Sequence, residues 1–145
     1  MLQRSFGLLL LVLSNCALAQ PTPAAAPHLI GGEIPSYPPI ARAARVSGTI
    51  KVSVTVESGR VTKLDVLEAK GVSGSQVLEH GSPLLTDPTL SNLRSWRFQS
   101  SVNTSFDVIY TYAIDPTLPE GNPKIEISPL LNVTITTSPL TLDLY

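Results

Sequence analysis

A regular alternation of apolar and polar side chains over residues 49–57 constrains this chain more than any other feature of its sequence. The apolar side chains occupy every second position, at Ile50, Val52, Val54 and Val56. A period of two gives a strand one buried and one wet face, which is typical of an antiparallel sheet covered on one side. With 43% hydrophobic residues in a chain of 145, there is enough apolar material for the core of one domain.

A second strand is predicted over residues 61–67, because a Ser-Gly turn signal directly follows the first strand. Leu64 and Val66 are expected to face the core in this hairpin. Residues 70–82 are rich in glycine, serine and other polar side chains, so we interpret them as a loop.

Two helices are predicted, one on each side of the hairpin in the sequence. The first covers residues 40–46, where prolines precede a run of alanines and a Ser-Gly pair follows. Its predicted buried face consists of Ile40, Ala43 and Ala44. The second helix is expected to begin with Asp87 as its N-cap and Pro88 in its first turn. The side chains that it turns toward the core are Leu90, Leu93 and Trp96.

A third strand is predicted over residues 106–114, where apolar and aromatic side chains again alternate. Its buried face consists of Phe106, Val108, Tyr110, Tyr112 and Ile114. Residues 117–145 form a C-terminal extension in which prolines interrupt the alternation, so one or two edge strands are expected there. The predicted fold class is therefore α+β, with a small antiparallel three-stranded sheet, two helices and a C-terminal β extension.

The N-terminal residues have the pattern of a targeting segment. Arg4 precedes a short apolar run, and an Ala-Leu-Ala sequence ending at Ala19 fits a cleavage site, so residues 1–19 are interpreted as a signal peptide for export. Two alternatives stay open: an uncleaved anchor, and lipidation at Cys16, which follows a degraded lipobox. Residues 20–35 form a leader rich in proline and alanine, which favour extended geometry near its start.

Composition argues against several classes of function. The formal net charge is −1 and the basic residues are scattered, so there is no basic patch for nucleic acid. The two histidines and the single cysteine do not have the spacing of a metal site, and no nucleotide-binding loop or nucleophile elbow occurs. Glu68, Glu79 and Asp87 are interpreted as solvated carboxylates. We therefore expect no enzymatic activity, no cofactor and no metal.

Four motifs, in order, carry a resemblance to a known family. They are YPPIARAA from Tyr37, the SGT that leads into the alternating strand, GRVT from Gly59, and WRF from Trp96. Together these motifs resemble those of the TonB C-terminal domain family. The resemblance covers residues 37–114, within a predicted domain of residues 36–116.

The resemblance implies that the domain binds a short peptide of an outer-membrane transporter, by adding it as a strand to the edge of its last strand. Carried over onto this sequence, the partner-binding residues are Tyr37, Pro38, Phe106, Val108, Tyr110 and Tyr112. From the residues alone, Tyr110 and Tyr112 fit core packing equally well, and Tyr37 with Pro38 fits a helix entry equally well.

The predicted function is a periplasmic binding module that engages an outer-membrane TonB-dependent transporter, or a similar partner, and supports transmembrane transport. The alternative is an envelope scaffolding protein that keeps the fold and binds another partner, without energy transduction. Energy-transducing members of the family have an N-terminal anchor and a long proline-rich spacer, and this sequence indicates neither. An edge-strand homodimer stays open, as does the question of whether residues 117–145 cover the recognition edge.

Overall fold

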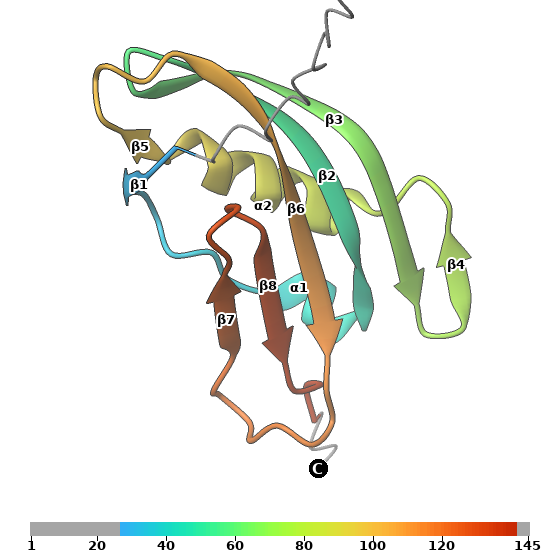
Figure 1. Ribbon diagram of the computed structural model, residues 1–145. Coiled ribbons are helices and arrows are strands. Elements are labelled where there is room, and N and C mark those ends of the chain that lie inside the picture. Colours follow the sequence, from blue (N-terminus) through green and yellow to red (C-terminus); the bar gives the residue numbers. More distant parts are fainter. Residues whose placement is uncertain (1–26, 142–145) are drawn as a thin grey trace, which may run out of the picture.

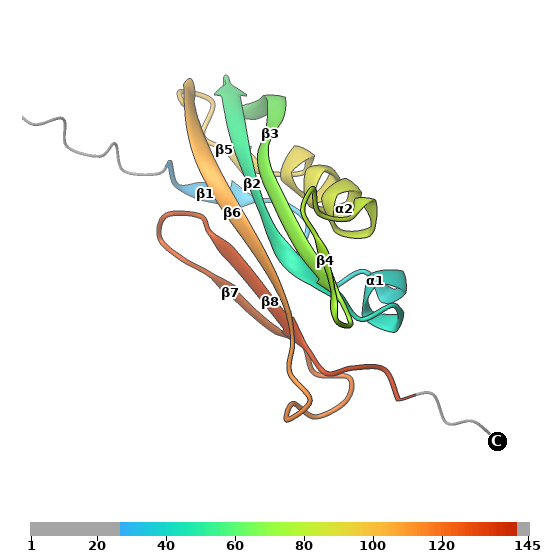
Figure 2. The same ribbon diagram turned by 90° about the vertical axis from the view of Figure 1, so that its right-hand side faces the viewer.

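The computed structural model describes residues 27–141, so the predicted signal peptide and residues 20–26 of the leader lie outside the described part. In chain order the elements are β1 (Leu29–Gly31), α1 (Pro39–Ala43), β2 (Val46–Glu57), β3 (Arg60–Ser73), β4 (Gln76–Leu78), α2 (Pro83–Arg94), β5 (Arg97–Phe98), β6 (Thr104–Ile114), β7 (Lys124–Ile127) and β8 (Val133–Thr137). The strands form one curved mixed sheet, and both helices lie on the same side of its centre (Figure 1, Figure 2). The predicted α+β class is confirmed.

The predicted three-stranded sheet is wrong in its extent. The strand order is β1-β5-β3-β2-β6-β8-β7, and β4 pairs with β3 on the side away from β2. The three predicted strands correspond to β2, β3 and β6, which form the centre of this larger sheet. Short strands widen it beside β3, and the C-terminal extension widens it beside β6.

The alternation that defines β2 builds most of the core. Its four predicted apolar side chains are at most 1% exposed. They face α2, in which Leu85 and Leu93 are also buried. β6 pairs antiparallel with β2 and turns its predicted face the same way, with Val108 and Tyr110 fully buried. The two strands whose alternation is clearest in the sequence are therefore confirmed.

β3 is twice as long as the predicted strand and ends at Ser73 instead of residue 67. Its pairing register with β2 shifts twice, which leaves Thr62 and Leu67 as extra residues in two β-bulges. These bulges break the alternation on which the prediction rested. Val66, which the sequence analysis expects to face the core, lies opposite the buried Val52 but is 42% exposed. The predicted loop over residues 70–82 is also wrong, since the end of β3 turns back into β4 there.

The first helix is shorter than predicted. α1 ends at Ala43, and Arg45 with a φ of 51° turns the chain directly into β2, so the Ser-Gly pair lies in the strand and does not end the helix. The predicted buried face is wrong, because Ala41 is the buried residue of α1 while Ile40 is 69% exposed.

The second helix begins earlier than predicted. Ser82 is the N-cap of α2, where its hydroxyl accepts a hydrogen bond from the Leu84 N–H at 3.3 Å, and Pro83 follows in the first turn. The Ser-Pro pair thus plays the part that the sequence analysis gave to Asp87 and Pro88. Pro88 lies inside the helix, where it has no N–H to donate to the carbonyl of Leu84.

The C-terminal extension forms a hairpin of β7 and β8 that becomes part of the main sheet. β8 pairs with β6 in parallel, from Tyr110 opposite Val133 to Ile114 opposite Thr137, and β7 is the outermost strand. The chain beyond β8 is tied to the first helix, because the Arg42 guanidinium donates to the carbonyl and the hydroxyl of Ser138 at 2.7 and 2.9 Å. β8 is therefore an interior strand, while β7 is the edge strand that was expected.

Candidate functional site

The outer edge of β6 has a covered part and an open part. Residues 110–114 pair with β8, which lies beside the lower half of β6 in Figure 1. Among the described residues, no strand pairs with residues 104–108 on that side. The C-terminal extension thus covers part of the edge that the resemblance implies for partner binding, and leaves the rest accessible.

The direction of the backbone groups along this edge follows from two hydrogen bonds. Ile109 N–H donates to the Asn132 side-chain oxygen at 3.0 Å, and Asp115 N–H donates to the Thr137 carbonyl at 2.8 Å. The backbone N–H and C=O groups of odd-numbered residues in β6 therefore point toward β8. Even-numbered residues then point toward β2, since backbone groups alternate between the two sides of a strand. The open stretch therefore presents outward the N–H and C=O groups of Ser105 and Asp107.

The surroundings of the open stretch are apolar on one face and charge-paired on the other. On the helix side, Phe106 is partly buried and its ring packs edge-to-face on Phe98, with 5.8 Å between ring centroids. On the opposite face, Asp107 pairs with Lys51 at 3.3 Å, and Ser105 hydrogen-bonds Thr55 at 3.1 Å. An added strand would meet an aromatic side chain on one face and a neutral polar surface on the other.

Most side chains that were predicted to bind a partner are buried. Val108, Tyr110, Tyr112 and Tyr37 are at most 7% exposed, whereas Phe106 and Pro38 are partly exposed. The four predicted residues on β6 are all even-numbered, so their backbone N–H and C=O groups face β2 and not the open edge. The structure thus brings these four residues onto one strand, and the residues with outward groups are Ser105 and Asp107, on either side of Phe106. Partner binding by the predicted set stays a prediction.

The buried tyrosines form a polar network inside the core. The Tyr110 hydroxyl donates to the Asn92 side-chain oxygen at 2.6 Å, and the Tyr112 hydroxyl lies 2.7 Å from that of Thr89. The Tyr37 hydroxyl donates to the Val46 carbonyl. Burial raises the pKa of all three tyrosines above the ordinary value of 10.0. These phenols therefore stay neutral and serve as hydrogen-bonding core residues.

A second free edge, on β3, is built differently. Residues 61–70 of β3 have no strand partner on their outer side among the described residues, but this stretch contains both bulges. It also has four charged side chains paired within the strand, Lys63 with Asp65 and Lys70 with Glu68. Bulges and charges are the usual protection of an edge against strand addition. The open stretch of β6 contains no bulge and is the better candidate.

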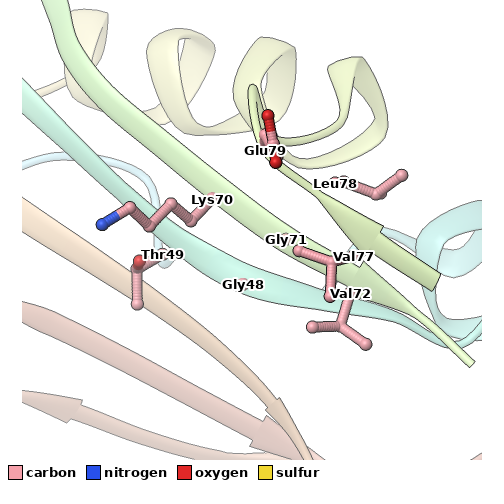
Figure 3. A pocket seen from close by; sticks show the side chains of 8 residues that line it. All are labelled: Gly48, Thr49, Lys70, Gly71, Val72, Val77, Leu78 and Glu79. Atoms are coloured by element: carbon pink, nitrogen blue, oxygen red, sulfur yellow. The ribbon is translucent and has the colours of Figure 1, made fainter. Parts of the chain in front are cut away.

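Two apolar hollows lie away from the β6 edge. One, of about 520 Å³, lies over the opposed Gly48 and Gly71 and is flanked by Val72 and Val77 (Figure 3). Alanine at position 48 would place its Cβ 2.1 Å from the Lys70 carbonyl oxygen, so the sheet itself requires glycine there. The other, of about 310 Å³, lies between the β1 segment and Ile125 and Ile127 of β7.

Residues 27–141 contain no group of three or more histidine, cysteine, aspartate or glutamate side chains arranged to hold a metal ion. In the same part of the chain, no helix has the length and hydropathy that crossing a membrane requires. The three carboxylates that the sequence analysis singled out are exposed, and Lys70 lowers the pKa of Glu68 by a hydrogen bond and by its charge. Backbone groups and apolar side chains are thus what the candidate site offers.

Ser105, Asp107 and Asn132 were missed by the sequence analysis. The direction of a backbone group depends on pairing register, and no local pattern of side chains reports it.

Comparison with known families gives a match over most of the described residues. A family model described as Gram-negative bacterial TonB protein C-terminal matches residues 33–115. The matched region ends just after β6, so β7 and β8 lie outside it. No curated protein matches this chain.

Proposed function

Because the chain belongs to the family of Gram-negative bacterial TonB protein C-terminal domains, we propose that it is a periplasmic binding module that takes an extended segment of an outer-membrane transporter as an added strand on β6. Domains of this family act in envelope transport. The observation that supports the proposal is the open stretch of β6, where the backbone groups of Ser105 and Asp107 point away from the sheet. Strand addition draws its affinity from such groups.

The proposal concerns binding and not catalysis. The candidate edge supplies hydrogen-bond donors and acceptors from the main chain, with Phe106 as an apolar contact on one face. Recognition by main-chain pairing, with pockets for alternate side chains, requires no cofactor.

The covered half of the edge favours a second candidate, an envelope scaffold that binds another partner without energy transduction. β8 occupies β6 from Tyr110 onward, so a long transporter segment cannot pair along the whole strand. A strand edge that is partly covered in this way would suit a partner segment of different length or composition from one that pairs along the whole strand. The identity of what binds therefore separates the two candidates.

A proline at position 107 tests strand addition directly. It removes the outward N–H of Asp107, while the hydrogen bonds between β6 and β2 use the even-numbered residues and stay intact. Asp107→Ala is the matched control, because it removes the ion pair with Lys51 and keeps the N–H.

The assay is retention of detergent-solubilised outer-membrane proteins on the immobilised chain from Gln20 onward, identified by mass spectrometry. We expect wild type and Asp107→Ala to retain a transporter and Asp107→Pro to lose it, with unchanged far-UV circular dichroism. Equal retention by the proline variant would refute strand addition on β6. Retention of other envelope proteins, with loss in the proline variant, would favour the scaffold.

A further inference from the structure

The open stretch of β6 ends at one side chain. In a regular parallel ladder, the N–H of Ile109 would donate to the main-chain carbonyl of residue 131 on the neighbouring strand. The chain has left the strand path at that point, because Leu131 has a left-handed φ of 60°. Asn132 replaces the missing acceptor, as its side-chain oxygen accepts the Ile109 N–H at 3.0 Å.

The backbone of Asn132 is fixed by the turn that precedes β8. Its carbonyl accepts the N–H of Ser128 at 2.8 Å, and its N–H donates to the Ser128 hydroxyl at 3.2 Å. Its main chain is thus used within the turn, and its side chain is the group that faces β6. The Asn132 side chain thus occupies the last position of the ladder between β6 and β8, and hydrogen bonds to Ser128 hold its backbone in place.

β8 itself is a fixed part of the fold. Val133 and Ile135 are fully buried, and Leu131 before them is 6% exposed. At the other end, Arg42 holds Ser138 with two hydrogen bonds. An incoming strand therefore meets a permanent boundary and not a displaceable flap.

We propose that Asn132 sets the register and the length of the segment that adds to β6. The segment lies end to end with β8, pairs with Ser105 and Asp107, and stops at Asn132. Its length is about five residues, since a strand rises by about 3.3 Å per residue along the open residues 104–108. This inference rests on the proposed strand addition, and it adds that Asn132 limits the length of the added segment.

The chemistry of the segment follows from the two faces of the edge. Side chains on the helix side of an added strand lie beside Phe106 and Val108, so apolar residues are expected at alternate positions. Side chains on the opposite face lie beside Asp107, whose charge is already paired with Lys51. The preferred occupant is an uncharged extended peptide with alternating apolar residues.

The test uses acetylated peptides of alternating threonine and valine, from about three to about nine residues long, and follows the backbone amides of the chain from Gln20 onward by NMR. For wild type we expect affinity to rise by roughly two- to tenfold for each added hydrogen bond and to stop rising at about five residues. Shifts should centre on Ser105 and Asp107. In Asn132→Ala the plateau should move to about seven residues.

Two further variants make the result specific. Asn132→Asp keeps an oxygen acceptor for Ile109 and should retain the wild-type plateau, and Thr134→Ala, on the outer face of β8, should do the same. Hydrogen exchange of the Ile109 amide supplies a readout without peptide: it should be slow in wild type and Asn132→Asp, and fast in Asn132→Ala.

Three outcomes would overturn the inference. One is affinity that keeps rising with length in wild type, and another is an unchanged plateau in Asn132→Ala. A third is fast exchange of the Ile109 amide in wild type, which would leave strand addition itself intact. If no peptide of any length shifts the amides of β6, the proposed strand addition fails, and the inference fails with it.

Discussion

Replacing Asn92 by alanine should destabilise the protein more than any other single change to a polar side chain of α2. The Asn92 side-chain oxygen accepts the Tyr110 hydroxyl at 2.6 Å and the Trp96 indole N–H at 3.3 Å. Its amide group donates to the Glu33 carbonyl at 2.9 Å. One side chain therefore joins the helix, β6 and the segment after β1.

The magnitude follows from the groups that the substitution leaves without a partner. Tyr110 and Trp96 are at most 1% exposed, and each buried group without a hydrogen bond costs about 1–3 kcal/mol. Alanine recovers about 0.5 kcal/mol through its better helix propensity. The net expectation is a loss of about 3 kcal/mol in the free energy of unfolding, a large part of the roughly 5–15 kcal/mol that holds a domain together.

Urea unfolding measures this loss, followed by the fluorescence of the single tryptophan and by far-UV circular dichroism. The midpoint should fall by about 2 M at an m-value of about 1.5 kcal/mol/M. Tyr110→Phe should cost only about 1 kcal/mol, because Trp96 keeps its acceptor. Ser91→Ala, exposed on the same helix, should change stability by less than about 0.5 kcal/mol. A loss below about 1 kcal/mol in Asn92→Ala would refute the reasoning.

Three further predictions concern other parts of the fold. Burial raises the pKa of Tyr110, Tyr37 and Tyr112, so the unfolded chain ionises first: stability should hold below about pH 10 and fall above it, as urea titrations at several pH values would show. Gly48→Ala should cost about 2–4 kcal/mol, because its Cβ would meet the Lys70 carbonyl, whereas Gly31→Ala, with its nearest contact at 3.9 Å, should stay near neutral in the same assay. Arg42→Ala should cost about 1–2 kcal/mol and speed amide exchange in β8, and unchanged exchange there would argue against its role in fixing that strand.

The central strands could be predicted from sequence because their signal is local. β2 and β6 each have one face on the core, so burial imposes a period of two on their residues. β3 escapes this logic after residue 67, since the extra Leu67 shifts the alternation by one place. The predicted start of α2 was wrong for a related reason. Two possible helix starts, Ser82-Pro83 and Asp87-Pro88, lie close together in the sequence, and only packing decides which one caps the helix.

The candidate site was less predictable than the fold. The resemblance pointed to the strand that has the open edge, but its residues were chosen by their aromatic and apolar side chains, most of which serve the core. What faces outward from the open edge is the main chain of Ser105 and Asp107, whose direction is set by pairing with β2. The proposed limit at Asn132 depends on a parallel contact between β6 and β8 that joins distant parts of the sequence. Neither the direction of these backbone groups nor the contact between β6 and β8 produces a local sequence pattern that could be recognised.

Under the proposed strand addition, the energies on the two halves of β6 favour the open half over the half that β8 covers. Displacing β8 would expose Val133 and Ile135, at about 1.5–3 kcal/mol for each buried side chain. The backbone hydrogen bonds gained by a longer added strand contribute about 0.5–1.5 kcal/mol each, and β8 already makes such bonds. A partner strand would therefore exchange equal hydrogen bonds and lose the apolar burial, unless its own side chains filled the same space. Binding opposite residues 104–108 requires no such exchange, because that stretch has no strand to displace among the described residues. Under the proposed strand addition, the C-terminal hairpin thus shortens the available edge of β6, and a partner would have to match this short stretch to bind.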